Sequence, residues 1–439
     1  MLFVKKSEQK NEWTNWAGNV TAGPEYYHAP KNLQEIQELV DSCRIRGASL
    51  RVTGAGHSFS AVARPDKDSM TLDNLRGLIS YDTEVMEARL WAGTYLYEAA
   101  PLLETVGMAF ENMGDVQAQT IAGAVSTGTH GTGITLGSLS NQIVAWTWID
   151  GMGTINYHRR GSDDLSKALS LSLGLLGVLV DVTLKTIPLY SLQVKSTRRT
   201  FSDALSEWPS DLQSNRHLEW FYFPGTTTVQ VKKTNIVPLV RQSKQSKAVD
   251  IVKSGLIETA AFKVISEICR IKPRLSRKMT ALSASSIPTG VKEGIYHEVL
   301  PSPRLVKFTE TEYALPLTLF EEVIEEIHHF MLAHPFYVHF PIECRVTAGE
   351  DGFLSPTQGE ATVFLAFHMY KGMDEQPYFK WVRNLMDKYG GRPHFGKVNN
   401  LTSDKIKELY PDLKRFMTIK EAHDPREVFM SDYMRQLFR

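Results

Sequence analysis

The sequence is poor in the features that mark several protein classes. It has three cysteines (Cys43, Cys269 and Cys344) without a CxxC pair, which excludes a disulfide framework or a cysteine zinc cluster. Its 49 basic and 49 acidic side chains cancel, so we expect no nucleic-acid partner. The longest uncharged apolar stretch, 168–180, falls short of the roughly 20 residues that a transmembrane helix requires. Because the first residues, MLFVKK, also carry charge where a signal peptide is apolar, we expect a cytoplasmic protein.

What is present is an ordinary globular composition with clear secondary-structure signals. The 439 residues are 42% hydrophobic and 22% charged, which suits about two or three domains. Apolar residues at helical spacing predict a helix over 32–46, with Asn32 and Glu35 as a capping box and Gly47 at its end. The other predicted elements are strands over 49–53, 337–346 and 362–370 and a helical tail over 404–439.

Two glycine-rich segments lie in the N-terminal half. The first, Gly54-Ala55-Gly56-His57-Ser58, follows the strand over 49–53, but Phe59 replaces the third glycine of a dinucleotide GxGxxG fingerprint. The second, 114–133, interleaves glycines with serine and threonine hydroxyls. Glycine lets backbone N–H groups approach a phosphate closely, so two such loops suit a pyrophosphate-bearing ligand. Tight structural turns are the alternative.

Polar residues that could take part in a reaction cluster in the C-terminal half. Glu343 and Arg345 are two residues apart and so share one face of the strand over 337–346. They form either a surface salt pair, or a carboxylate and a guanidinium that hold a substrate. A second polar cluster is His394-Phe395-Gly396-Lys397. No metal site is expected, because five histidines lack the close spacing of a ligand set: His57, His130, His339, His368 and His394.

A basic segment stands out in the middle of the chain. Residues 232–278 hold twelve Lys or Arg against three Asp or Glu. Val249, Val252, Val264 and Ile268 belong to an apolar stripe at helical spacing within it. The segment indicates either an ordinary helix with a solvated face, or a peripheral membrane or partner contact through 246–272.

Four motifs in order resemble the vanillyl-alcohol-oxidase-type flavoproteins, and within them the sugar-1,4-lactone oxidases (gulonolactone and arabinonolactone oxidases) and alditol oxidases. They are VTGAGHSFS (52–60), GDVQAQTIAGAVSTGTHGTG (114–133), FPIECR (340–345) with LSP at 354–356, and HFGK (394–397). The resemblance implies an α+β, two-domain FAD-binding fold of the vanillyl-alcohol-oxidase/PCMH type with an antiparallel-sheet cap domain. On this division the FAD-binding domain spans 1–190, completed by 400–439, and the substrate or cap domain spans 191–399.

The resemblance also implies FAD as the cofactor. In the related oxidases the histidine of GxGHS is joined covalently to the flavin 8α-methyl group, so we expect the same linkage at His57. The cofactor-binding residues implied in this way are Val52, Thr53, Gly54, Ala55, Gly56, His57, Ser58, Gly114, Thr120, Ile121, Gly123, Gly128, His130, Gly133, Val180 and His394.

By the same resemblance, Glu343, Arg345, Lys397 and Thr120 are the catalytic residues, near the flavin and the alcohol carbon. Phe395 stands where the family usually has tryptophan, which predicts a reshaped pocket wall. The first functional hypothesis is oxidation of a CH–OH group of an aldono-1,4-lactone, with molecular oxygen as acceptor and hydrogen peroxide as product. An alditol oxidase acting on a terminal CH₂OH is the second. A flavin-carrying protein without a sugar substrate is the third.

Overall fold

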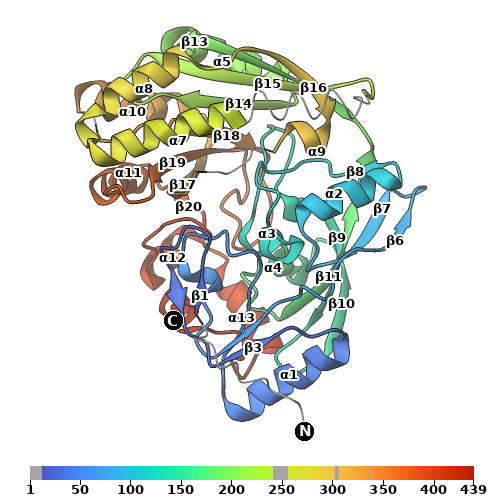
Figure 1. Cartoon of the computed structure of the whole chain (residues 1–439). Coiled ribbons are helices and arrows are strands. Elements are labelled where there is room, and N and C mark those ends of the chain that lie inside the picture. The colour runs from blue at the N-terminus through green and yellow to red at the C-terminus, as the bar shows by residue number, and fades with distance from the viewer. Residues whose placement is uncertain (1–11, 241–255, 302–305, 335) are drawn as a thin grey trace.

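The computed structural model describes residues 12–240, 256–301, 306–334 and 336–439. A large sheet with most of the long helices forms the upper part of Figure 1, and the smaller sheets lie below it together with α1 and the C-terminal helices. Helices and mainly antiparallel strands occur in both parts, which confirms the predicted α+β class.

The first compact unit is a three-stranded parallel sheet, in the order β3-β5-β4, covered by α1 (Leu33–Arg46). Asn32 caps this helix by accepting the Glu35 N–H at 2.9 Å, and Gly47 ends it with φ 62°. The predicted Asn32 cap and glycine stop are thereby confirmed, but Glu35 does not complete the box, because its carboxylate accepts from the Lys31 N–H at 2.8 Å and from Asn32 Nδ2 at 3.0 Å. The strands are β3 (Tyr26–His28), β4 (Leu50–Val52) and β5 (Asp68–Met70).

A five-stranded antiparallel sheet, in the order β10-β9-β11-β7-β6, forms the second layer of this lower part. Its strands are β6 (Leu78–Asp82), β7 (Glu87–Trp91), β9 (Ile143–Ile149), β10 (Ile155–Arg159) and β11 (Val178–Lys185). The helices between them are α2 (Leu96–Thr105), α3 (Ile121–Thr127) and α4 (Asp164–Ser170). Two short strand pairs accompany it, β1 (Trp13–Thr14) with β2 (Thr21–Ala22) and β8 (Met108–Ala109) with β12 (Ile187–Pro188).

The C-terminal tail is helical, as predicted, and returns to this lower part (Figure 1). Phe416 and Phe438 belong to the same buried cluster as Ile121 and Trp146. Burial of large apolar side chains is the main favourable contribution to folding, so the tail is integral to the N-terminal core. The division at residues 190 and 399 stays a prediction. The helices are α12 (Ser403–Leu409), α13 (Leu413–His423) and α14 (Asp432–Phe438).

The upper part is built on an eight-stranded antiparallel sheet, in the order β16-β13-β15-β14-β18-β19-β17-β20. Its strands are β13 (Ser191–Thr200), β14 (His217–Tyr222), β15 (Thr228–Val237), β16 (Gly290–Ile295), β17 (Phe308–Pro316), β18 (Ile342–Thr347), β19 (Thr362–Tyr370) and β20 (Arg392–Pro393). Its helices are α5 (Phe201–Ser214), α7 (Leu256–Ile271), α8 (Ser276–Ser285), α9 (Tyr296–Val299), α10 (Phe320–Ala333) and α11 (Gln376–Lys388).

The two faces of this sheet differ in polarity. Directly paired residues of antiparallel strands point to the same side. Trp220 pairs with Cys344, which pairs with Leu365, and this apolar row packs with helices α5, α10 and α11 in one buried cluster. On the opposite face Glu343 lies across from Ala366, which lies across from Glu312. The charged face is the one that meets the glycine loops.

The strand predicted over 337–346 is shorter than expected. Strand β18 begins only at Ile342, because Pro341 lacks the N–H that the ladder needs. His339 does not share the face of Glu343. Instead it is buried under α7, where its Nε2 lies 2.9 Å from the Ser266 hydroxyl.

Candidate active site

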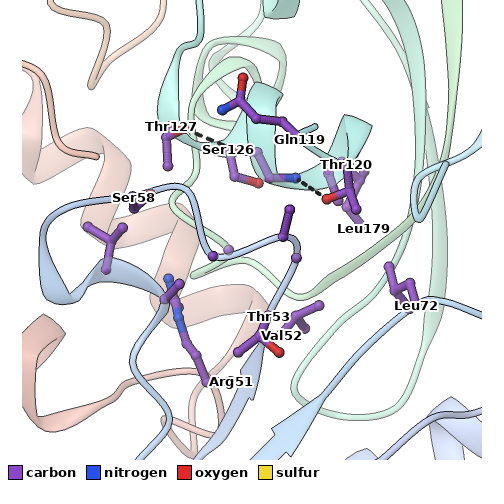
Figure 2. Close-up of a pocket in the computed structure, with 18 of the residues that line it drawn as sticks. Arg51, Val52, Thr53, Ser58, Leu72, Gln119, Thr120, Ser126, Thr127 and Leu179 are labelled. Atoms are coloured by element: carbon purple, nitrogen blue, oxygen red, sulfur yellow. Dashed lines mark hydrogen bonds between the residues drawn. The ribbon is translucent and has the colours of Figure 1, made fainter. Parts of the chain in front are cut away.

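The first of two adjacent cavities has a volume of about 980 Å³ and lies where β4 runs into the first glycine loop. Residues 52–58 form one wall, and the start of α3 forms the wall across from it. Figure 2 shows Val52 and Thr53 on the first wall, with Gln119, Ser126 and Thr127 on the opposite side. The third side comes from the 172–174 turn.

Glycine is required where this loop touches α3. Thr120 is the N-cap of α3, and its Oγ1 accepts the Gly123 N–H at 3.2 Å (Figure 2). A Cβ on Gly54 would lie 2.6 Å from that same Oγ1. The loop therefore comes close to the helix only because residue 54 has no side chain, and backbone groups line the cavity there.

Arg51 adds a positive charge to this cavity. Its side chain lines the wall, is only 7% exposed, and donates from Nη2 to the Leu173 carbonyl at 2.6 Å. Within the part of the chain that the structure describes, its Nε has no hydrogen-bond partner and the guanidinium joins no ion pair. Burial lowers the pKa of Arg51 to about 10, so it stays cationic at neutral pH. A buried cation beside backbone donors fits a pyrophosphate group.

The second cavity, of about 750 Å³, shares His57, Ser58, Gln119 and Thr127 with the first. His57 stacks on Trp16 with ring centroids 5.6 Å apart. The Phe59 N–H donates to the Gly396 carbonyl at 2.6 Å. The GAGHS loop and the HFGK loop, far apart in the sequence, therefore meet at the junction of the two cavities.

Arg345 is held among three carboxylates on the floor of the second cavity. Its Nε donates to Glu219 Oε1 at 2.8 Å, and its Nη2 lies 2.8 Å from Glu343 Oε2 and 3.6 Å from Asp115 Oδ2. Burial alone would lower the pKa of Arg345, but these carboxylates outweigh it and hold the pKa well above its ordinary value. The guanidinium is thus a permanent, oriented cation.

Lys397 faces a second group of carboxylates, on β17. Its Nζ lies 2.7 Å from Glu310 Oε2 and 3.7 Å from Glu312 Oε2. On its other oxygen, Glu312 lies 3.4 Å from His130 Nε2. Burial raises the pKa of Glu312, yet Lys397 and His130 outweigh this and hold the pKa well below its usual range. Burial lowers the pKa of His394 in the same wall to about 3, so this imidazole is neutral.

The structure brings most of the predicted residues together, but not all. Residues 52–58, Thr120 and Gly123 line the first cavity, so Thr120 is separated from the other three predicted catalytic residues. The residues that line the second cavity include His57, Ser58, Gly114, His130, Glu343, Arg345, His394 and Lys397. Neither cavity is lined by Ile121, Gly128, Gly133 or Val180.

The side chains of Val180, Ile121 and Phe395 belong to the hydrophobic core. The side chain of Val180 is completely buried in the core near α1, and its neighbour Leu179 lines the first cavity. Ile121 is a core residue of α3. Phe395 does not form a pocket wall, because it is buried and stacks on Tyr410 with ring centroids 5.4 Å apart.

Several site residues were missed by sequence reasoning. Glu310 and Glu312 are two apart in the alternating run FTETEYALP, so the argument that singled out Glu343 and Arg345 would also have found them. Arg51 stands directly before the predicted loop. Asp115 and Gln119 lie inside the 114–133 motif but were not singled out, and Trp16 and Glu219 are recognisable only in the fold.

Comparison with known proteins places this arrangement in a family. The model of the D-arabinono-1,4-lactone oxidase family matches residues 182–437, more than half of the chain. The chain belongs to this family. A general FAD-binding domain model also matches residues 24–156. Membership confirms the predicted family and the expectation of an FAD-dependent oxidoreductase acting on sugar lactones.

Individual relatives agree with the family assignment along nearly the whole chain. L-gulono-1,4-lactone dehydrogenase of Mycobacterium tuberculosis is 32% identical and covers 97% of this chain and 98% of its own. L-gulonolactone oxidase of Bos taurus is 28% identical with the same coverage. Among solved structures, cholesterol oxidase from B. sterolicum superposes with a TM-score of 0.81 at 15% identity, covering 98% of this chain and 97% of that one. This likeness confirms the two-domain FAD-binding fold.

Proposed function

We propose that the protein oxidises the CH–OH group beside the carbonyl of an aldono-1,4-lactone and passes the electrons to molecular oxygen, forming hydrogen peroxide. The observation that carries this proposal is the Glu343–Arg345 pair, held at 2.8 Å in a cavity that adjoins the glycine-lined one. The family match and the names of the relatives favour a lactone over a polyol as substrate.

The residues of the second cavity have different roles toward the substrate. Bound FAD supplies a two-electron acceptor for the hydride of the alcohol carbon. Arg345 holds and polarises the substrate oxygen, since its position is set by Glu219 and Glu343. Glu343 accepts hydrogen bonds from sugar hydroxyls. The Glu310 carboxylate accepts the hydroxyl proton, and Lys397, whose Nζ lies 2.7 Å from its Oε2, holds it in place.

The cofactor itself would be held by the first cavity. Arg51 and the backbone of residues 52–58 suit its pyrophosphate, as the unpartnered Nε of Arg51 and the tight contact at Gly54 indicate. His57 lines both cavities, which supports it as the site of the covalent link to the flavin. Stacking on Trp16 would fix the plane of its ring.

Turnover with a panel of sugars tests the function. The purified protein is given gulono-, galactono- and arabinono-1,4-lactone, and xylitol and sorbitol as uncharged polyols, while hydrogen peroxide is measured. Because one relative is named a dehydrogenase, a parallel assay replaces oxygen with an artificial dye. Flavin reduction by lactones and not by polyols supports the proposal; reduction by no sugar refutes it.

We also propose a peripheral membrane contact through 246–272, of which 246–255 lie outside the described residues. On α7 the predicted apolar stripe faces solvent, with Val264 59% and Ile268 37% exposed. Arg270 and Lys272 are exposed beside it. A described helix with an exposed apolar stripe and basic neighbours suits an anionic lipid surface. No helix among the described residues has the length and apolarity to cross a bilayer. Sedimentation with anionic vesicles, compared with neutral ones, tests the contact.

A further inference from the structure

The second cavity contains more negative than positive charge. Its lining includes four carboxylates, from Asp115, Glu310, Glu312 and Glu343. Among the described residues that line it, the basic side chains are Arg345 and Lys397, together with the imidazoles of His57, His130 and His394. The neutral His394 adds no charge, and Glu219, just behind the lining, adds one more carboxylate against Arg345.

Each of the two cations is matched by more than one of these carboxylates. Arg345 contacts Glu343 and Glu219, both at 2.8 Å. Lys397 contacts Glu310 at 2.7 Å and lies 3.7 Å from Glu312. One carboxylate is enough to balance a lysine. Even a protonated His130, 3.4 Å from Glu312, would leave five carboxylates facing Arg345, Lys397 and itself, so negative charge is in surplus. Glu312 is only 3% exposed, so water screens this charge weakly.

The surplus negative charge matters because a lactone can hydrolyse to an anion. A lactone ring opens in water to an aldonate, which gains the hydroxyl group freed from the ring and carries a carboxylate. A simple carboxyl group has a pKa of about 3.5, so an aldonate is an anion at neutral pH. An anion that enters the second cavity meets like charge, and both cations there are already engaged. Like-charge contacts in a partly dry site cost several kcal/mol and serve as a means of rejection.

We propose that Glu310 and Glu312 are specificity-determining residues that exclude aldonate anions and thereby select the closed, uncharged lactone. This proposal rests on the proposed function of the same site. It assigns the two glutamates a role beyond placing Lys397, because one of them would suffice for that task.

The test compares two inhibitors of the same chain length and similar shape, one charged and one neutral. One is the aldonate derived from the preferred lactone, and the other is its aldonamide, which keeps the open chain and replaces the carboxylate by an uncharged amide. Both are measured as inhibitors of lactone oxidation by the holoenzyme at pH 7. In the natural protein we expect the aldonate to bind more weakly than the aldonamide by about tenfold or more.

The Glu312→Gln variant removes one charge and keeps the shape of the side chain. We expect the aldonate-to-aldonamide ratio of inhibition constants to fall by about tenfold, while the aldonamide constant changes little. Glu408→Gln, on the exposed surface of α12, is the matched control and should leave the ratio unchanged. A purely structural role of Glu312 would shift both inhibitors together. If Glu312→Gln does not fold, Glu310→Gln removes a charge from the same pair. Because Glu310 also takes part in proton uptake, the two inhibitors are then compared by binding titration against the flavin absorbance rather than by turnover.

Two outcomes overturn the proposal while lactone turnover persists. In the first, aldonate and aldonamide inhibit the natural protein equally, so charge has no part in selection. In the second, the ratio stays the same in both glutamine variants. Failure of the proposed function is distinguishable from these results, because in that case no lactone reduces the flavin of the natural protein.

Discussion

Replacing Arg345 by lysine keeps the charge of the second cavity but removes the geometry that orients it. The guanidinium reaches two carboxylates at 2.8 Å through different nitrogens, Nε toward Glu219 and Nη2 toward Glu343. A lysine has one nitrogen and no fork, so it can keep at most one of these short contacts. A hydrogen bond to a charged group contributes about 1.5–3 kcal/mol, and loss of a donor aimed at the reacting oxygen costs about 2.7–4 kcal/mol of barrier.

The barrier change predicts a rate of flavin reduction lower by roughly 10²–10³-fold in Arg345→Lys, since 1.36 kcal/mol is tenfold. The assay is anaerobic stopped-flow reduction of the bound flavin by the preferred lactone. The deficit should not change with pH near neutrality, because surrounding carboxylates hold the pKa of Arg345 well above its ordinary value. Arg345→Ala is less informative, because it would leave buried carboxylates unpaired at a cost of about 3–5 kcal/mol.

An arginine outside the second cavity serves as a control for the effect of an arginine-to-lysine substitution on flavin reduction. Arg415 on α13 is 49% exposed and pairs with Asp164 and Asp412. Arg415→Lys should reduce its flavin at the natural rate, because exposed ion pairs contribute little. Natural reduction kinetics in Arg345→Lys would refute the assignment of Arg345 to the substrate site.

Three further outcomes are expected. His57→Ala should remove flavin fluorescence from the acid-denatured protein on a denaturing gel, whereas a fluorescent band would exclude His57 as the link. In that background, Arg51→Met should weaken FAD binding by tenfold or more in equilibrium titration, since a charged partner contributes about 1.5–3 kcal/mol; an unchanged dissociation constant would contradict its role. Burial lowers the pKa of His339 to about 4 in the folded protein, whereas in the unfolded chain its pKa is about 6.5. Between these values only the unfolded chain binds the proton, which destabilises the fold. As the pH falls from 6.5 to 4, the natural protein should therefore lose on the order of 3 kcal/mol more stability than His339→Gln, measured by chemical denaturation. The exposed control His329→Gln should lose as much as the natural protein.

Local features of the fold could be predicted from the sequence because they depend on neighbouring residues. The helix from Leu33 to Arg46 has its cap and its stop within the same segment. The strand from Thr362 to Tyr370 was predicted to the residue. The strand around Glu343 was predicted too long, since alternation continues through Pro341 although the hydrogen-bond ladder cannot.

The helix α7 shows why polarity alone does not reveal which side of a helix is buried. In an ordinary helix with a solvated basic face the apolar stripe would pack on the core, yet Val264 and Ile268 are exposed, while Ser266 and Cys269 are buried. The Ser266 hydroxyl meets His339, so a polar contact replaces part of the apolar one. A contact with His339, which is distant in the sequence, thus helps to determine which face of α7 is buried.

The candidate site was predictable only where its residues carry local motifs. Glu343, Arg345 and Lys397 stand in such motifs, but the charges that define their state come from other strands. Glu219 reaches Arg345 because β14 pairs with β18, and Glu312 reaches Lys397 because β17 adjoins β20 and the loop that follows it. These contacts join residues more than eighty positions apart in the sequence. The spacing of residues within one strand therefore cannot predict them. The charge balance of the cavity, and with it the expected preference for an uncharged ring, is therefore a property of the sheet order.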